Sequence, residues 1–345
     1  MKLKITANDP LHFGSGKSMA AGESSFGADM FPPFPTVFLG AFRSAWLSRN
    51  AQFIKDANDP VIDPTYNYHI TFYTLLLNGV LHFPAPMDTY VVGDMPGLCQ
   101  LELRENDGLS NHSLPYYLWA DHDGKIANPV GRWISLESFS SYLHCSDDRV
   151  QSVKLSNYIK RETRIGIARD KARRAAADAM LYNTVLTRLD GVDFAVELEG
   201  ESLPESCGLI RLGKFGKTAN YTKADYRNEI SPGVINEQGV FKLYFATPAI
   251  FNGGTEPTLP EGLPKVELIA AATSGYENIG GYDLKLNRPK PMMRAVKAGS
   301  IFYYRLVDNT EAHRKLIVTK LHGHCISQVN QHAGLGLCYV GSIVR

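Results

Sequence analysis

The chain has 345 residues, 44% of them hydrophobic and 21% charged, which is typical of folded globular proteins and excludes disordered and fibrous classes. This length exceeds what one hydrophobic core usually serves, so two domains are expected. No stretch approaches the roughly 20 apolar residues of a membrane span, and the N-terminus carries no secretion signal. Five scattered cysteines without a C-x-x-C pair favour reduced thiols and argue against a zinc module. We therefore expect a cytoplasmic protein that needs no cofactor or metal.

The net charge of +1 conceals three basic segments. Lys160–Arg174 holds seven Lys or Arg residues against two acids, a local charge of +5. Arg211–Arg227 carries +4 and Lys285–Lys297 carries +5, so the rest of the chain sums to −13. Cations gathered in this way can form one basic face, as nucleic-acid-binding proteins require. We expect the three segments to meet in space.

The first elements follow from alternation and from an apolar stripe. Residues 2–7 alternate as a strand, and a glycine- and proline-rich loop extends from there to Pro35. A helix is expected from Thr36, as its N-cap, to about Asn50, with apolar side chains at i, i+3, i+4 spacing. Arg43 lies off the centre of that stripe, so it is either a solvent-facing charge or a functional one.

The middle of the chain contains one clear strand and one unpatterned basic stretch. Between Ala51 and Leu155, apolar runs interrupted by Pro, Gly and Asp turns indicate hairpins and short helices. Lys160–Arg174 shows neither helical nor strand periodicity, which predicts a basic arm between regular elements. Taken alone, such a run is more simply explained as a solvated loop. Residues 192–198 alternate strictly and predict a strand.

The second half combines strands with one capped helix. Gly208–Lys223 is predicted to be a basic, glycine-containing loop. Strands are predicted within three later ranges: 240–254, 265–274 and 298–307. Thr310 caps a helix that ends at Gly323, and a glycine turn leads into a final strand. Strands at the ends of both halves, with helices between them, predict an α+β protein of two similar units, 1–232 and 233–345.

Six separated pieces of the sequence occur in the order found in one protein family. They are NDPLHF, FPPFPTVFLGAFRSAWL, RETRIGIARDKARRAAADAMLY, GLIRLGKFGKTANYT, RPKPMMRAVKAGSIFYY and GLGLCYVG. In these pieces the chain resembles the RAMP superfamily of CRISPR-associated proteins, and within it the family of subunit three of the type III-B (Cmr) effector complex. The pieces span most of the chain, although residues 51–155 contribute little.

The resemblance implies two ferredoxin-like (RRM-like) units with glycine-rich loops and a projecting basic hairpin, or thumb, over about residues 155–190. It implies a non-catalytic subunit at the foot of an antiviral ribonucleoprotein complex, which holds the repeat-derived 5′ tag of the CRISPR RNA. The implied partners are that RNA, the large polymerase/cyclase-like subunit and the backbone RAMP subunit. Two departures concern the tag contacts. The run from His12 to Ser15 lacks the family's Arg, and Gly213-Lys214 replaces a double glycine.

Three ingredients of RNA binding occur together in the basic segments: cations for phosphates, glycine turns, and aromatic rings for stacking. The rings of Phe215, Tyr221 and Tyr226 interleave with lysines, although each could instead belong to the core. Gly334 and Gly336 either let the backbone approach a phosphate or serve a turn that needs positive φ. The predicted RNA-binding residues are Arg43, Lys160, Arg161, Arg164, Arg169, Lys171, Arg173, Arg174, Arg211, Lys214, Lys217, Arg294, Gly334 and Gly336.

Two other functions stay open. Some RAMP relatives cleave RNA with a histidine, which makes His12 the candidate general acid or base of an endoribonuclease that processes CRISPR RNA. A protein-docking module whose basic segments meet an acidic partner is the third interpretation. His322, His324 and Cys325 resemble metal ligands, but no second cluster in the sequence completes a tetrahedral site.

Overall fold

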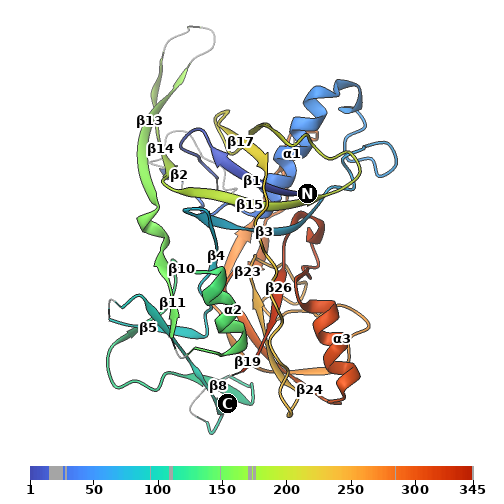
Figure 1. Ribbon diagram of the computed structural model, residues 1–345. Coiled ribbons are helices and arrows are strands. Elements are labelled where there is room, and N and C mark those ends of the chain that lie inside the picture. Colours follow the sequence, from blue (N-terminus) through green and yellow to red (C-terminus); the bar gives the residue numbers. More distant parts are fainter. Residues whose placement is uncertain are drawn as a thin grey trace.

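The fold combines antiparallel sheets with few helices, which confirms the α+β class (Figure 1). The computed structural model describes residues 1–14, 26–27, 29–93, 95–108, 112–147, 149–169, 173, 176–283 and 285–343. The helices of this part are α1 (Pro35–Arg49), α2 (Leu136–His144) and α3 (Glu311–Leu321), with the 3-10 turns η1 (Ala51–Phe53), η2 (Leu155–Asn157) and η3 (Gln331–Ala333). None of these helices is long and apolar enough to cross a membrane.

An eight-stranded sheet dominates the first half of the chain. In spatial order its strands are β12 (Val153–Lys154), β10 (Arg132–Ser135), β4 (Val80–Pro84), β3 (His69–Leu77), β15 (Val192–Glu199), β1 (Lys2–Ala7), β17 (Thr218–Lys223) and β16 (Cys207–Arg211). Strand β1 runs antiparallel to both neighbours, so Ile5 faces Phe194 on one side and Tyr221 on the other. Helix α1 covers this region, with the Phe38 ring 5.0 Å from Phe194 and the Phe42 ring 5.3 Å from Tyr221. Aromatic packing therefore fixes the start of α1 against the sheet.

A five-stranded sheet forms the second half of the fold. Its strands in spatial order are β19 (Val266–Ala272), β24 (Ile301–Leu306), β18 (Val240–Phe245), β26 (Leu337–Gly341) and β25 (His324–Cys325). Helix α3 buries Ile317 and Leu321 in the core of this sheet. Thr310 caps the helix, as predicted, by accepting a hydrogen bond from the His313 N–H at 3.2 Å.

The remaining strands outside the arm form smaller sheets, separate from the two large ones. They are β5 (Thr89–Val92), β6 (Gly97–Gln100), β9 (Ile126–Ala127) and β11 (Arg149–Gln151); the hairpin of β7 (Glu102–Glu105) and β8 (Tyr116–Trp119); the pair of β20 (Tyr276–Ile279) and β23 (Met293–Val296); and the pair of β21 (Tyr282–Asp283) and β22 (Arg288–Pro289). The third basic segment of the sequence thus lies in and around β22 and β23.

A shared core joins the two halves of the chain. The Phe139 ring on α2 lies 4.4 Å from Phe83 in the first sheet and 4.8 Å from Tyr244 in the second. In the same core, the buried carboxylate of Asp88 accepts hydrogen bonds from the hydroxyls of Tyr142 at 2.8 Å and Tyr303 at 2.7 Å. Since these groups come from both halves, the halves pack as partners with a common interior.

The basic arm is a long antiparallel hairpin that projects beyond the rest of the molecule (Figure 1). It consists of β13 (Ile159–Arg169) and β14 (Ala176–Leu189), and β14 also pairs with β2 (Phe26–Gly27). A projecting hairpin is what the family resemblance implied, and a simple solvated loop is not what the described residues form. The strand pattern was hidden in the sequence because Arg161, Arg164 and Ile165 are all exposed, so neither face needs a regular apolar alternation.

Two other expectations need correction. Helix α1 begins at Pro35, not after a Thr36 cap, because proline at the first helical position is preorganised and has no N–H to satisfy. The stretch 208–223 is not a loop but the hairpin of β16 and β17, in which only residues 212–217 form the turn. Strand β16 lies at the edge of the sheet, so Leu209 is exposed and the alternation expected of a strand is weak.

Candidate nucleic-acid interface

A cavity of about 660 Å³ opens where the first half of the chain meets the second. We call it the junction cavity. Its lining residues are Phe13, Gly14, Met30, Pro33, Phe34, Thr36, Val37, Leu39, Gly40, Arg43, Lys214, Asn278, Gly280, Gly281, Tyr282, Pro289, Lys290, Asn330, His332 and Ala333. A cavity of this size is in the range that binds small organic groups such as a nucleotide.

Backbone contacts in the first half hold one wall of the junction cavity in place. The Lys214 N–H donates to the His12 carbonyl at 2.9 Å, and the Met30 N–H donates to the Phe13 carbonyl at 2.8 Å. Gly213 has φ of +78°, and a Cβ there would lie 2.7 Å from the His12 carbonyl oxygen. The turn between β16 and β17 therefore needs glycine at this position to place Lys214 beside Phe13.

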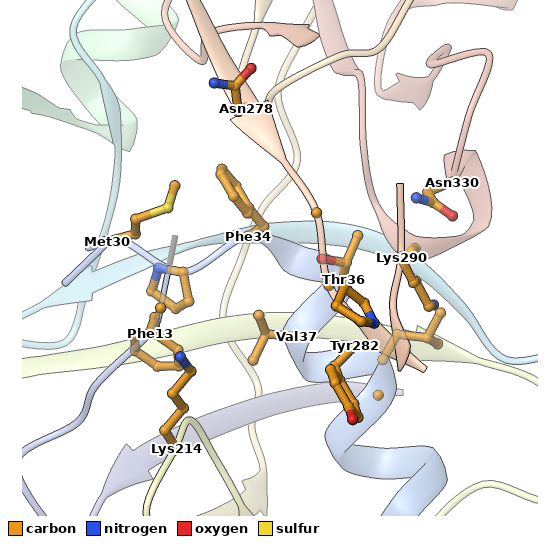
Figure 2. Close-up of a pocket in the computed structure, with 18 of the residues that line it drawn as sticks. Phe13, Met30, Phe34, Thr36, Val37, Lys214, Asn278, Tyr282, Lys290 and Asn330 are labelled. Atoms are coloured by element: carbon orange, nitrogen blue, oxygen red, sulfur yellow. The ribbon is translucent and has the colours of Figure 1, made fainter. Parts of the chain in front are cut away.

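The second half supplies the opposite wall, which includes residues of β20 and of the pair of β21 and β22. The Lys290 N–H donates to the Gly281 carbonyl at 2.9 Å, which keeps the start of β21 and the end of β22 together. The turn η3 adds Asn330 and His332. Figure 2 shows Lys214 at one end of the junction cavity and Lys290 with Asn330 at the other, with Val37 between them.

The charged side chains that line the junction cavity have one sign. Lys214, Lys290 and Arg43 line it together with the imidazole of His332, and no Asp or Glu is among its described lining residues. Phe34 and Tyr282 offer aromatic surface between these cations, and Phe13 lies beside Lys214. Separated cations with apolar and aromatic groups between them suit a ligand with phosphates at its ends and a sugar or base in its middle.

Arg43 has a structural task besides lining the junction cavity. Its Nη2 donates to Asp63 Oδ2 at 2.6 Å and its Nε donates to the Thr65 hydroxyl at 3.1 Å. Asp63 is buried, which raises its pKa, but hydrogen bonds from the Thr65 side chain, the Asn58 and Thr65 N–H groups and Arg43 outweigh burial and lower that pKa below 3.8. Arg43 therefore balances a buried carboxylate.

His12 is enclosed in the protein interior and has no exposed surface. Its Nδ1 lies 2.7 Å from the Val185 carbonyl oxygen, and the Phe215 ring lies 5.5 Å from the imidazole. Nε2 is buried without a hydrogen-bond partner among the described groups. An imidazole that cannot reach solvent cannot exchange protons with an RNA chain on the surface, so the geometry argues against the nuclease interpretation based on this residue.

The cations of the arm are exposed and only partly paired. Lys160 lies 3.9 Å from Asp190, and Arg164 lies 3.7 Å from Glu162. Arg161 and Arg173 are exposed as well. Lys171, Arg174 and the side chain of Arg169 lie outside the described residues.

Gly334 and Gly336 serve a tight turn, the alternative that the sequence left open. Both have positive φ, +84° and +79°, and a Cβ on Gly334 would lie 2.8 Å from Ile70. The Gly334 N–H already donates to the Gln331 carbonyl at 3.0 Å and the Gly336 N–H to the Pro248 carbonyl at 2.7 Å. Because these donors are engaged within the protein, they are not available to a phosphate in this arrangement.

The other predicted residues divide between the junction cavity and the outer surface. Lys217 pairs with Asp9 at 3.6 Å, and Arg294 lies over the exposed Tyr276 ring at 4.6 Å. Arg211 is exposed at the end of β16. Of the three candidate stacking rings, Tyr221 is buried and Tyr226 packs against the shared core, while Phe215 is 55% exposed.

Of the residues that line the junction cavity, sequence reasoning chose only Arg43 and Lys214, and it missed the charged or polar Lys290, Tyr282 and His332 among others. Lys290 and Tyr282 lie in or beside the third basic segment, whose charge was noted without choosing these residues. His332 lies two residues before Gly334 but gave no periodic or motif signal. Among the described residues, no group of His, Cys, Asp and Glu is arranged to hold a metal ion, and both ring nitrogens of His322 face backbone groups.

Comparisons with known proteins address the identity of the chain. A family model described as "CRISPR-associated protein (Cas_Cmr3)" matches residues 3–343. A chain of the cryo-EM structure of the Type III-B Cmr-beta bound to cognate target RNA aligns with a TM-score of 0.51 and 16% identity, over 88% of this chain and 86% of that one. A chain of the same complex bound to target RNA and AMPPnP gives 0.49 and 15%, over 88% and 86%. No curated protein matches.

Proposed function

Because the chain belongs to the Cas_Cmr3 family of CRISPR-associated proteins, we propose that it is an RNA-binding scaffold subunit of a type III-B CRISPR interference complex. Its ligand is the CRISPR RNA, whose 5′ repeat-derived tag it holds. The likeness in fold to a chain of an RNA-bound Cmr complex is consistent with this assignment. The protein works in the cytoplasm and contributes no catalytic group.

The junction cavity carries the proposal. Lys214 and Lys290 stand at its two ends, aromatic groups lie between them, and none of its described lining residues is acidic. A splayed nucleotide of a single strand places its base against aromatic or apolar groups and its flanking phosphates against cations. The 5′ tag is a single-stranded end, so it can enter a cavity that a duplex cannot.

The hairpin of β13 and β14 supports the RNA outside the junction cavity. Its exposed Lys160, Arg161 and Arg164 attract phosphates without the packing that would read a base. Since residues 160–169 lie on strand β13, which extends into solvent, they have the reach that backbone contacts require.

The two halves serve as two ferredoxin-like units, 1–232 and 233–345, with the RNA held where they meet. The remaining outer surfaces dock the large polymerase/cyclase-like subunit and the backbone RAMP subunit. This assignment of surfaces follows what the family resemblance implies, and it leaves the junction cavity for the tag.

Titration of the purified protein with RNA tests the proposed function. A 3′-labelled RNA that begins with the tag is compared with one of equal length and composition in which the tag is scrambled. We expect tighter binding of the tagged RNA, a steep loss of affinity with salt, and intact RNA after incubation. Equal affinity for both RNAs, even with the large subunit present, would favour a protein-docking module. Metal-independent cleavage that His12→Ala abolishes would support the endoribonuclease.

A further inference from the structure

The Lys290 end of the junction cavity contains a titratable group among permanent cations. The imidazole of His332 lines the junction cavity together with Lys290 and Arg43. Lys and Arg stay charged at neutral pH, whereas histidine changes charge near pH 6.5. A ligand phosphate at this end therefore meets two fixed charges and one adjustable charge.

The groups that face His332 come from every element packed around η3. Strand β3 contributes His69, whose ring lies 6.4 Å away, and α1 contributes Arg43 with its partner Asp63. The segment after β22 contributes Lys290, and β25 contributes His324 and Cys325, which share a smaller cavity with His332. Of these groups only Asp63 is acidic, and it is already satisfied by Arg43, Thr65 and the Asn58 N–H.

These neighbouring groups disfavour the protonated imidazole of His332 while no ligand occupies the junction cavity. Partial burial and the positive charges of His69, Arg43 and Lys290 lower the pKa of His332 below its usual value. A phosphate beside Lys290 would supply negative charge and reverse that balance. The ring is exposed enough to meet a ligand, so no rearrangement of the fold is required.

We propose, resting on the proposed function, that His332 is a proton-linked positioning residue, which takes up one proton when an RNA phosphate settles beside Lys290. No covalent bond forms or breaks; the proton comes from solvent and stays on the imidazole. A neutral His332 leaves the phosphate to the fixed charges of Lys290 and Arg43, and a charged His332 adds a third cation. The junction cavity thus binds a phosphate-bearing nucleotide more tightly than a nucleoside end, and more tightly as the pH falls.

The test is RNA binding measured by calorimetry in buffers of different ionisation enthalpy, which reports the number of protons taken up. Between about pH 6 and about pH 7.5 the wild type should take up a substantial fraction of one proton. Its affinity at about pH 6 should exceed that at about pH 8 by about three- to tenfold, since one unit of pKa change corresponds to about tenfold in affinity. His332→Gln should remove most of both effects. His313→Gln, which replaces a half-buried histidine of α3 that does not line the junction cavity, should keep them.

Lys290→Gln provides a second readout that does not depend on removing the histidine. Without the neighbouring ammonium, the pKa of His332 in the free protein should rise, so fewer protons should be taken up on binding. Equal proton uptake and pH dependence in the wild type and His332→Gln would overturn this inference and leave the proposed function standing. If the folded wild-type protein failed to bind the tagged RNA at every pH, both this inference and the proposed function would be overturned.

Discussion

The junction cavity and the arm both carry positive charge, but they differ in what surrounds it. In the junction cavity, Lys214 and Lys290 stand over aromatic and aliphatic side chains in a recess that a ligand would close off from water. On the arm, Lys160, Arg161 and Arg164 extend into solvent, where counterions screen them. Equal charges in the two places therefore have unequal effects on affinity.

The two sets of cations therefore have different tasks: those of the junction cavity fix the position of one phosphate, and those of the arm attract the strand as a whole. A cation inside a closed recess acts on one phosphate at one place, and its contribution persists at moderate salt. A cation on the arm acts on any phosphate within reach, and its contribution disappears as salt rises. The junction cavity should thus decide which nucleotide is held, and the arm should decide how fast and how firmly the strand is gathered.

The largest expected effect follows from reversing the lysines of the junction cavity. Lys214→Glu together with Lys290→Glu should weaken binding of the tagged RNA by at least about a hundredfold, because each of the two charged contacts contributes about 1.5–3 kcal/mol and every 1.4 kcal/mol is a tenfold change. Fluorescence anisotropy at physiological salt measures the change. Lys125→Glu with Lys265→Glu, two exposed lysines that do not line the junction cavity, provide the matched control. Equal losses in both double variants would mean that only net charge matters.

The next effect concerns the wall of the junction cavity. Arg43→Ala should lower the free energy of unfolding by about 2–3 kcal/mol, because it leaves the buried Asp63 carboxylate without its cation. Denaturant unfolding measures this change. Arg161→Ala on the arm should leave stability within about 0.5 kcal/mol. If Arg43→Ala melts like the wild type, the pair does not support the junction cavity.

The same variant carries a pH signature. The folded pKa of Asp63 is depressed below 3.8, so its ionised form stabilises the fold above the unfolded pKa. That stability is lost as the pH falls through the folded pKa. The difference between wild type and Arg43→Ala should therefore be constant near neutrality and shrink below about pH 4. A difference that persists in acid would assign the effect to packing rather than charge.

The smallest effect is expected on the arm. Replacing Lys160, Arg161 and Arg164 with Glu should weaken RNA binding by about fivefold at physiological salt and reduce the slope of log affinity against log salt by about 2. The melting temperature should stay nearly unchanged, because all three side chains are exposed. A large drop in melting temperature would show that the hairpin belongs to a core. An unchanged salt slope would remove the arm from the RNA interface.

Much of the fold could be predicted because its signals are local. Strict alternation predicted β15, and Thr310 with Gly323 predicted both ends of α3. The hairpin of β16 and β17 was missed because an edge strand has few neighbours to impose alternation, and its glycines resemble a loop. The arm was ambiguous for a related reason, since a strand exposed on both faces has no apolar pattern.

The site was harder to predict because it depends on contacts between distant residues. Lys214 and Lys290 are 76 positions apart in the chain and meet the same recess only after both halves fold. Arg43 was correctly chosen as a residue of interest, but its partner Asp63 has no sequence signal. Gly334 and Gly336 were predicted to bind RNA, with a positive-φ turn as the alternative; both have positive φ, and their N–H groups are engaged by protein carbonyls that sequence could not reveal.

Site-specific crosslinking tests the central claim, that the 5′ tag enters the junction cavity, most directly. A benzoylphenylalanine in place of Tyr282 would present its reactive carbonyl at the junction cavity, and the same group in place of Trp119 would present it on the β7–β8 hairpin. After irradiation with tagged RNA, we expect the Tyr282 replacement to link to a single nucleotide of the tag and the Trp119 replacement to leave the tag unlinked. Crosslinks from position 282 that spread evenly along the RNA, or that avoid the tag, would contradict the account.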